Sequence, residues 1–180
     1  MDKTERTLES EQIFDGRLIK VYRDKIEQPS GRKSTREVVR HPDGVCIAAV
    51  DKYGRIAFVS QYRYPLGREF LELPAGKVDP GEDHKKAAER ELKEEIGAET
   101  ENLAFLGGAV SSPGFCDETI WCYVATDFDM GDPNPDEGEL LTIKWVTLDE
   151  AVKMAMSGEL EDLKSRFLVL AADRYLRGTK

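Results

Sequence analysis

The chain has 180 residues, of which 40% are hydrophobic and 34% are charged, as in an ordinary globular protein with a proper core. Its formal net charge of −9 argues against non-specific binding to nucleic acid or to an anionic membrane. Residues 1–10 lack the apolar stretch of a secretory signal, and no apolar run could span a bilayer, so we expect a cytoplasmic protein. Cys46, Cys116 and Cys122 lack metal-ligand spacing, which predicts buried thiols in a reducing compartment.

Residues 1–42 are predicted to form an arm of antiparallel strands. Turn signals at Asp15-Gly16 and at Pro29-Ser30-Gly31 separate strand-like stretches, and a return strand follows over residues 35–40. A sheet of this size is marginally stable alone and needs another surface to pack on. We therefore divide the chain into an N-terminal β-sheet arm and a main domain, residues 43–180.

The order of elements in the main domain predicts an α/β protein, with an α/β/α sandwich around a mixed sheet. The continuous apolar run Val45–Val50 is typical of a buried central strand. Gly97 ends a helix predicted over residues 82–96, and Thr147 with Glu150 forms a capping box for a second helix. Further strands are predicted over 55–62, 70–73, 103–110, 119–125 and 140–146, and a last amphipathic helix over roughly 160–177.

The first predicted helix of the main domain concentrates negative charge on one face. Glu91, Glu94 and Glu95 stand at positions i, i+3 and i+4, where like charges repel by a few tenths of a kcal/mol for each pair. Acidic oxygens gathered on a rigid element are the ligands that hard divalent cations need. Gly76 and Gly81 bracket the loop before this helix and let its backbone approach a ligand. Taken alone, the three acids are more typical of a solvated surface helix rich in glutamate.

The joint pattern over residues 76–98, called the box below, resembles the Nudix box G-x5-E-x7-R-E-U-x-E-E-x-G-U, where U is aliphatic. The matching residues are Gly76, Glu82, Arg90, Glu91, Leu92, Glu94, Glu95 and Gly97. Ala98 departs from the pattern because it is smaller than the usual aliphatic residue, which concerns packing rather than chemistry.

The resemblance implies the Nudix fold and hydrolysis of a nucleoside diphosphate linked to another moiety, assisted by two or three Mg²⁺ ions, with Mn²⁺ a possible substitute. It further implies that Glu91, Glu94 and Glu95 are metal ligands and that the carbonyl of Ala75 joins them. Glu95 is also counted with the catalytic residues. Arg90 is counted there too, because it stands one turn before Glu94 and can hold the acidic face in register.

A second resemblance, to the ADP-ribose pyrophosphatase subgroup, covers nearly the whole chain. Pro113 lies sixteen positions after Gly97, within Ser112-Pro113-Gly114-Phe115, although this is also good turn chemistry. Gln61-Tyr62-Arg63, Leu73-Pro74-Ala75-Gly76 and the N-terminal arm resemble the subgroup as well. The resemblance implies hydrolysis of ADP-ribose to AMP and ribose 5-phosphate by a homodimer with exchanged N-terminal strands. The alternatives are another substrate, such as a nucleotide sugar or NADH, and a module that binds ADP-ribose without cleaving it.

The same resemblance implies which residues contact the substrate. Arg63 matches a substrate-contacting arginine, and Arg36 is a weaker candidate for a contact made across the dimer; a surface salt bridge is the alternative for each. Phe14 and Tyr22 are candidates for stacking on adenine, with the core of the sheet as the alternative. Glu118 is a further candidate contact.

The general base of the subgroup is a glutamate on a mobile loop before the penultimate strand. Here the candidates are Glu137 and Glu139, and we favour Glu137 as the base with Glu139 near a metal. Gly138 between them would let the loop close over a substrate. A merely solvated acidic loop is the alternative interpretation of this segment.

Overall fold

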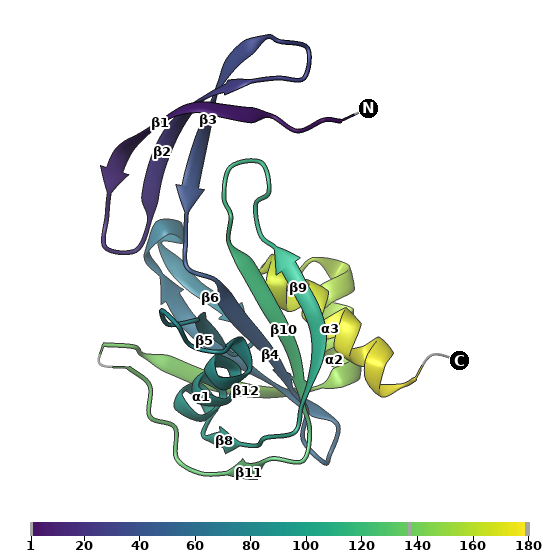
Figure 1. The fold of residues 1–180 in the computed structure, drawn as a ribbon. Helices are drawn as coiled ribbons and strands as arrows, with labels where there is room; N and C mark the ends of the chain where they lie inside the picture. Colours follow the sequence, from purple (N-terminus) through teal and green to yellow (C-terminus); the bar gives the residue numbers. More distant parts are fainter. Residues whose placement is uncertain (1, 137, 179–180) are drawn as a thin grey trace. The chain divides into compact units, whose positions relative to one another are not determined.

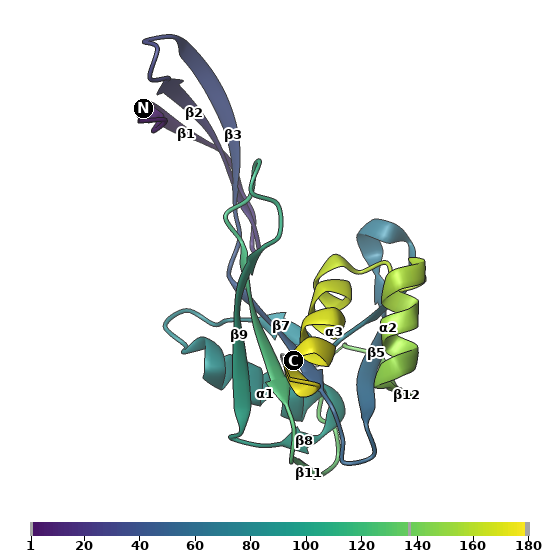
Figure 2. The same ribbon diagram turned by 90° about the vertical axis from the view of Figure 1, so that its right-hand side faces the viewer.

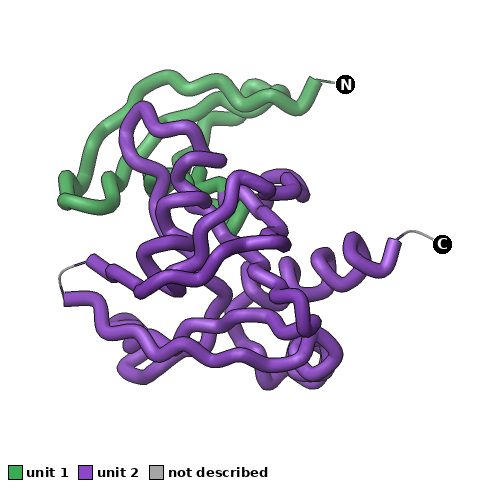
Figure 3. Tube along the Cα trace, turned by 90° about the horizontal axis from the view of Figure 1, so that it is seen from below, with its two compact units in different colours: residues 1–43, 110–119 green, residues 44–109, 120–180 purple. Residues whose placement is uncertain are grey.

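The computed structural model describes residues 2–136 and 138–178. The chain forms two compact units, shown in different colours in Figure 3. Unit 1 comprises residues 1–43 and 110–119, and unit 2 comprises residues 44–109 and 120–180. Among the described residues, no helix combines the length and the apolar character needed to cross a membrane.

Unit 1 is built on a three-stranded antiparallel sheet, as the sequence predicts. Its strands are β1 (Arg6–Asp15), β2 (Lys20–Glu27) and β3 (Lys33–Arg40), in the order β1-β2-β3 (Figure 1). The loop of residues 110–119 adds to this sheet, because the N–H of Val39 donates a 2.7 Å hydrogen bond to the carbonyl of Phe115. The sequence did not predict that a loop so distant along the chain belongs to the N-terminal unit.

In unit 2, the strand β4 (Gly44–Ala49) has helices on both sides (Figures 1 and 2) and contributes to two hydrophobic cores. Odd-numbered side chains of β4 pack in the core that contains α1 (His84–Ile96). Even-numbered side chains pack in the core that contains α2 (Leu148–Ser157) and α3 (Leu163–Leu176). Because successive strand residues point to opposite faces, a strand covered on both faces must be apolar throughout. The predicted sandwich of helices around strands is thereby confirmed.

The strands of unit 2 divide between two main sheets. A four-stranded sheet has the order β7-β4-β10-β9 and contains the parallel pair β4 and β10, so it is mixed. An antiparallel sheet has the order β12-β5-β6, and β8 pairs with β11. The remaining bounds are β5 (Arg55–Arg63), β6 (Arg68–Glu72), β7 (Ala75–Lys77), β8 (Ala98–Glu99), β9 (Leu103–Val110), β10 (Thr119–Ala125), β11 (Asp129–Met130), β12 (Leu141–Thr147) and the 3-10 turn η1 (Tyr64–Leu66). The short strands β7, β8 and β11 were not predicted.

The helix ends are fixed by capping residues. The helix α1 begins at His84 rather than at residue 82, because the Asp83 carboxylate accepts hydrogen bonds from two backbone N–H groups of the first turn. It ends where Gly97 adopts a φ of 70°, as predicted from the sequence. Thr147 caps α2 as predicted, by accepting a hydrogen bond from the N–H of Glu150.

The prediction of buried thiols is confirmed for Cys46 and Cys122 but not for Cys116, which is half-buried in the 110–119 loop. Burial raises the pKa of Cys46 well above its ordinary value and that of Cys122 to about 11. Since the thiolate is the reactive form, a short treatment with iodoacetamide at neutral pH should alkylate Cys116 alone. Mass spectrometry of the native protein should show one label, and three labels only after denaturation. Rapid labelling of two or three thiols would contradict this burial.

Candidate active site

The loop that precedes α1 lies directly against the acidic face of the helix. Its glycine at position 76 belongs to β7, which pairs with the central strand β4. A Cβ atom built on Gly76 would overlap the carboxyl group of Glu91. With any other residue at position 76, the carboxyl group of Glu91 would have to move away from the loop.

Arg90 joins the acidic face of α1 to the loop. Its Nε and Nη2 donate to the carboxylate of Glu82 at 3.1 and 3.0 Å, and Nη2 also donates to the carbonyl of Lys77 at 2.9 Å. Its Nη1 donates to Glu91 at 2.7 Å and to Glu94 at 3.0 Å. These carboxylates raise the pKa of Arg90 above its ordinary value, and Glu82 makes the largest contribution. Its hydrogen bonds in this structure are all with residues of the box, and its role in catalysis stays a prediction.

Glu95 is the most deeply buried of the three glutamates, with 4% of its surface exposed. Its carboxylate accepts a 3.0 Å hydrogen bond from the N–H of Ala75. Burial raises the pKa of Glu95 to about 8; Glu91 and Glu139 raise it as well, whereas the Ala75 N–H and Arg63 oppose the shift. Burial also raises the pKa of Glu91. The charged form of both glutamates is thus disfavoured in the metal-free protein.

The acidic face fits a divalent cation in its chemistry. The side chains of Glu91 and Glu94 are 13% and 27% exposed, so none of the three glutamates is splayed into solvent. Their hard oxygen atoms are the ligands that Mg²⁺ prefers. Among the described residues, however, no three acidic, histidine or cysteine side chains are already arranged to hold a metal. In the arrangement seen, Arg90 supplies the positive charge between Glu91 and Glu94.

The acidic loop before β12 contributes a further carboxylate to this face. Glu139 is half-buried and raises the pKa of both Glu91 and Glu95, so its charge reaches the metal candidates. Gly138 has a φ of 90°, a conformation that favours glycine. Glu137, the favoured base in the sequence analysis, lies outside the described residues.

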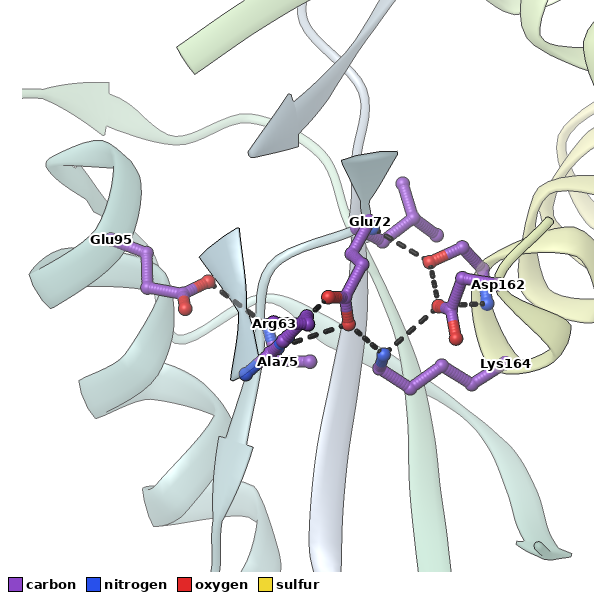
Figure 4. Close-up of polar contacts among 8 residues, drawn as sticks. Arg63, Glu72, Ala75, Glu95, Asp162 and Lys164 are labelled. Carbon is purple, nitrogen blue, oxygen red and sulfur yellow. Dashed lines mark hydrogen bonds and ion pairs between the residues drawn. The ribbon is translucent and has the colours of Figure 1, made fainter. Parts of the chain in front are cut away.

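Arg63 lies on β5 within the same unit and is paired with a carboxylate that the sequence analysis missed. Its Nε and Nη2 donate to Glu72 at 2.5 and 3.0 Å (Figure 4). Glu72 is 3% exposed and also pairs with Lys164 at the start of α3. The sequence signal that could have found it is a glutamate within the otherwise apolar stretch 70–73, a position where a charge is costly unless it is paired.

The remaining candidates belong to unit 1. Arg36 forms a salt bridge with Glu5 through Nε and Nη2 at 2.9 and 2.5 Å, which is the alternative foreseen for it. Phe14 is 53% exposed, so its ring is not part of a sheet core. The carboxylate of Glu118 lies 3.2 Å from Nδ1 of His41.

The family of the chain follows from comparison with known proteins. A model of the NUDIX domain matches residues 40–167, and a model of the nucleoside diphosphate sugar hydrolase N-terminal domain matches residues 5–39. The chain therefore belongs to the Nudix family, which confirms the resemblance carried by the box.

Curated relatives match along most of their length. The chain is 41% identical over 163 residues to a methanol dehydrogenase activator of Bacillus methanolicus, covering 89% of this chain and 88% of the relative. It is 38% identical over 167 residues to an ADP-ribose pyrophosphatase of Bacillus subtilis (strain 168), covering 92% and 90%. A crystal structure described as an ADP compounds hydrolase superposes with a TM-score of 0.83 at 24% identity, covering 98% and 96% of the two chains, and supports the fold.

Proposed function

We propose that this protein is a Mg²⁺-dependent pyrophosphohydrolase that cleaves ADP-ribose to AMP and ribose 5-phosphate. The observation that carries the proposal is the buried carboxylate of Glu95, which lies close to the charges of Glu91, Glu139 and Arg63. Burial and the neighbouring carboxylates disfavour the charged form of Glu95, and a bound divalent cation would offset this cost. The similarity to an ADP-ribose pyrophosphatase along nine-tenths of the chain supports the substrate.

In this proposal, Glu91, Glu94, Glu95 and the carbonyl of Ala75 hold Mg²⁺, with Mn²⁺ as a possible substitute, and Glu139 lies near the metal. Bound Mg²⁺ would lower the pKa of a water molecule and neutralise charge on the diphosphate. The four residues lie on α1 and β7, which are joined by the hydrogen bonds from Ala75 to Glu95 and from Arg90 to Lys77.

The remaining roles belong to side chains that contact the substrate or move a proton. Glu137 remains the proposed general base, and Glu139 is the second candidate because its charge reaches the acidic face. Arg63 is proposed to donate hydrogen bonds to the diphosphate, since guanidinium groups match phosphate oxygens well.

We further propose that residues 1–42 form a dimerisation arm for the hydrolase domain, residues 43–180, in a cytoplasmic homodimer. The arm exposes apolar side chains that a second copy could cover: Leu8, Ile13, Phe14 and Leu18. In such a dimer Arg36, Phe14 and Glu118 are candidates for substrate contacts. Light scattering during gel filtration should give twice the mass of one chain, and a monomer at micromolar concentration would contradict this arrangement.

The substrate is tested by incubating the protein with ADP-ribose and Mg²⁺ in H₂¹⁸O. We expect AMP and ribose 5-phosphate, with the ¹⁸O label identifying the phosphorus that water attacks. GDP-mannose, UDP-glucose and NADH should react more slowly. If one of these compounds is hydrolysed faster, that compound rather than ADP-ribose is the preferred substrate. Binding of ADP-ribose without any hydrolysis would indicate a non-catalytic module instead.

The similarity to a methanol dehydrogenase activator favours a second candidate function, the activation of another enzyme. It is tested by adding the protein to a purified methanol dehydrogenase and following the oxidation of methanol. The Glu95→Gln variant in the same assay separates activation that needs the acidic face from activation by binding alone.

A further inference from the structure

We propose that Glu72 and Lys164 are positioning residues that hold the guanidinium of Arg63 so that its free edge is presented to the diphosphate of the substrate. The inference rests on the proposed function, because it takes Arg63 as a substrate contact. It assigns a role to the start of α3, which lies outside the box and 92 positions along the chain from Glu72.

The pairing between Arg63 and Glu72 is side-on. It uses Nε and Nη2 of the guanidinium and leaves Nη1 outside the pair. Figure 4 shows the hydrogen bonds from Arg63 to Glu72 and the one from Ala75 to Glu95. A guanidinium that is already fixed along one edge loses little further conformational freedom when its other edge binds phosphate.

Lys164 keeps Glu72 ionised and in place. Burial raises the pKa of Glu72, but Arg63 and Lys164 together hold it below its ordinary value. Lys164 in turn lies 2.9 Å from the carboxylate of Asp162. Two cations and two anions therefore balance one another in this part of unit 2.

The same helix start fixes the backbone next to Glu72. The Asp162 carboxylate accepts hydrogen bonds from the N–H and the hydroxyl of Ser165, at 3.0 and 2.5 Å. The Ser165 oxygen accepts a 2.7 Å hydrogen bond from the N–H of Leu73. Two residues further along, the N–H of Ala75 binds Glu95. The start of α3 is thus connected to Arg63 through Glu72 at the end of β6, and to the acidic face through Leu73 and Ala75, where β7 begins (Figure 4).

A purely structural role is the competing explanation. Buried ion pairs can often be replaced by apolar residues without loss of stability, so stability alone does not explain why four charges are kept here. A positioning role makes a different prediction, because it concerns substrate binding. The two explanations are separated by measuring KM and the thermal midpoint in the same set of variants.

A double-mutant cycle between Arg63 and Glu72 tests the positioning directly. Arg63→Ala should raise KM for ADP-ribose by about tenfold or more, the loss expected for a charge-assisted hydrogen bond, with a smaller change in kcat. Glu72→Gln should raise KM in the same way. The double variant should resemble Arg63→Ala alone, because Glu72 acts through Arg63. Multiplicative effects, or an unchanged KM in Glu72→Gln, would overturn the proposal.

Stability is controlled with a charge-balanced variant, because Glu72→Gln leaves Lys164 without one of its two carboxylate partners. Glu72→Gln/Lys164→Met removes one charge of each sign and should recover most of the thermal midpoint. Its KM should stay raised, since Arg63 still lacks its carboxylate. A KM that recovers together with stability would show that the network is only structural. Lys164→Met should raise KM by a smaller factor, and Lys164→Arg should restore it.

A readout that needs no turnover follows from the Nε–H of Arg63. In protein labelled with ¹⁵N-arginine, this proton should exchange slowly in the wild type and rapidly in Glu72→Gln. Fast exchange in the wild type would show that the hydrogen bond between Arg63 and Glu72 does not persist in solution. Absence of ADP-ribose hydrolysis by the wild type would remove the proposed function and this role with it. Normal wild-type turnover with multiplicative effects in the cycle would remove the positioning role alone.

Discussion

Glu95→Gln is expected to lower kcat for ADP-ribose by at least about a hundredfold, more than the loss usual for a residue that only supports a metal ligand. Glutamine has the shape of glutamate but not its charge, so it cannot neutralise a divalent cation. The measurement is steady-state hydrolysis at saturating Mg²⁺, with kcat and KM determined separately.

The fold should survive this substitution. Burial disfavours the charged form of Glu95, so glutamine removes a cost in the metal-free protein. The thermal midpoint in EDTA should be no lower than that of the wild type. Addition of Mg²⁺ with a diphosphate ligand should raise the midpoint of the wild type but not of the variant, because only binding to the folded state stabilises it.

Glu99→Gln is the matched control for Glu95→Gln. It makes the same chemical change in the same unit, at an exposed residue whose salt bridge with Lys93 spans 3.1 Å. Exposed pairs of this kind contribute little to stability, and we expect wild-type turnover. Wild-type turnover in Glu95→Gln itself would contradict the proposal that Glu95 is a metal ligand needed for hydrolysis.

Gly76→Ala is expected to lower turnover by about a hundredfold, the loss that a misplacement of roughly 1 Å can cause in an active site. The added Cβ would overlap the carboxyl group of Glu91, which must then move away from the loop. The backbone of Gly76 has no positive φ, so the substitution causes no conformational strain of its own. Turnover should therefore fall strongly in Gly76→Ala, whereas the thermal midpoint should fall only slightly.

Gly131→Ala is the control for this steric effect. A Cβ there would meet the carbonyl of Gly97 at 3.7 Å, an ordinary contact, and no positive φ is involved. Turnover should remain close to that of the wild type. Equal losses in the two variants would show that the close approach at Gly76 has no special role.

The features that the sequence predicted well depend on short-range patterns. The run Val45–Val50 is apolar throughout because β4 is covered on both faces, and this pattern is visible without knowing the partners. Gly97 and Thr147 mark helix ends because caps are made by neighbouring residues. The box was found because its glutamates, its arginine and its glycines lie within one loop and one helix.

The features that the sequence did not predict depend on contacts between distant residues. Lys164 and Glu72 are far apart along the chain, and neither belongs to a local pattern that would pair them. The strands β8 and β11 have two residues each, too few for an alternating pattern to be visible. The start of α1 was placed two residues early because Glu82 suits a helix N-terminus, whereas its side chain binds Arg90 instead.

The central claim is that the acidic face of α1 binds divalent cations against a diphosphate. Its most direct test is calorimetric titration of Mg²⁺ into the protein saturated with a non-hydrolysable methylene analogue of ADP-ribose, with Glu95→Gln titrated in parallel. We predict saturable uptake of Mg²⁺ by the wild type and strongly weakened uptake by the variant. No uptake by the wild type, or equal uptake by both proteins, would contradict the claim.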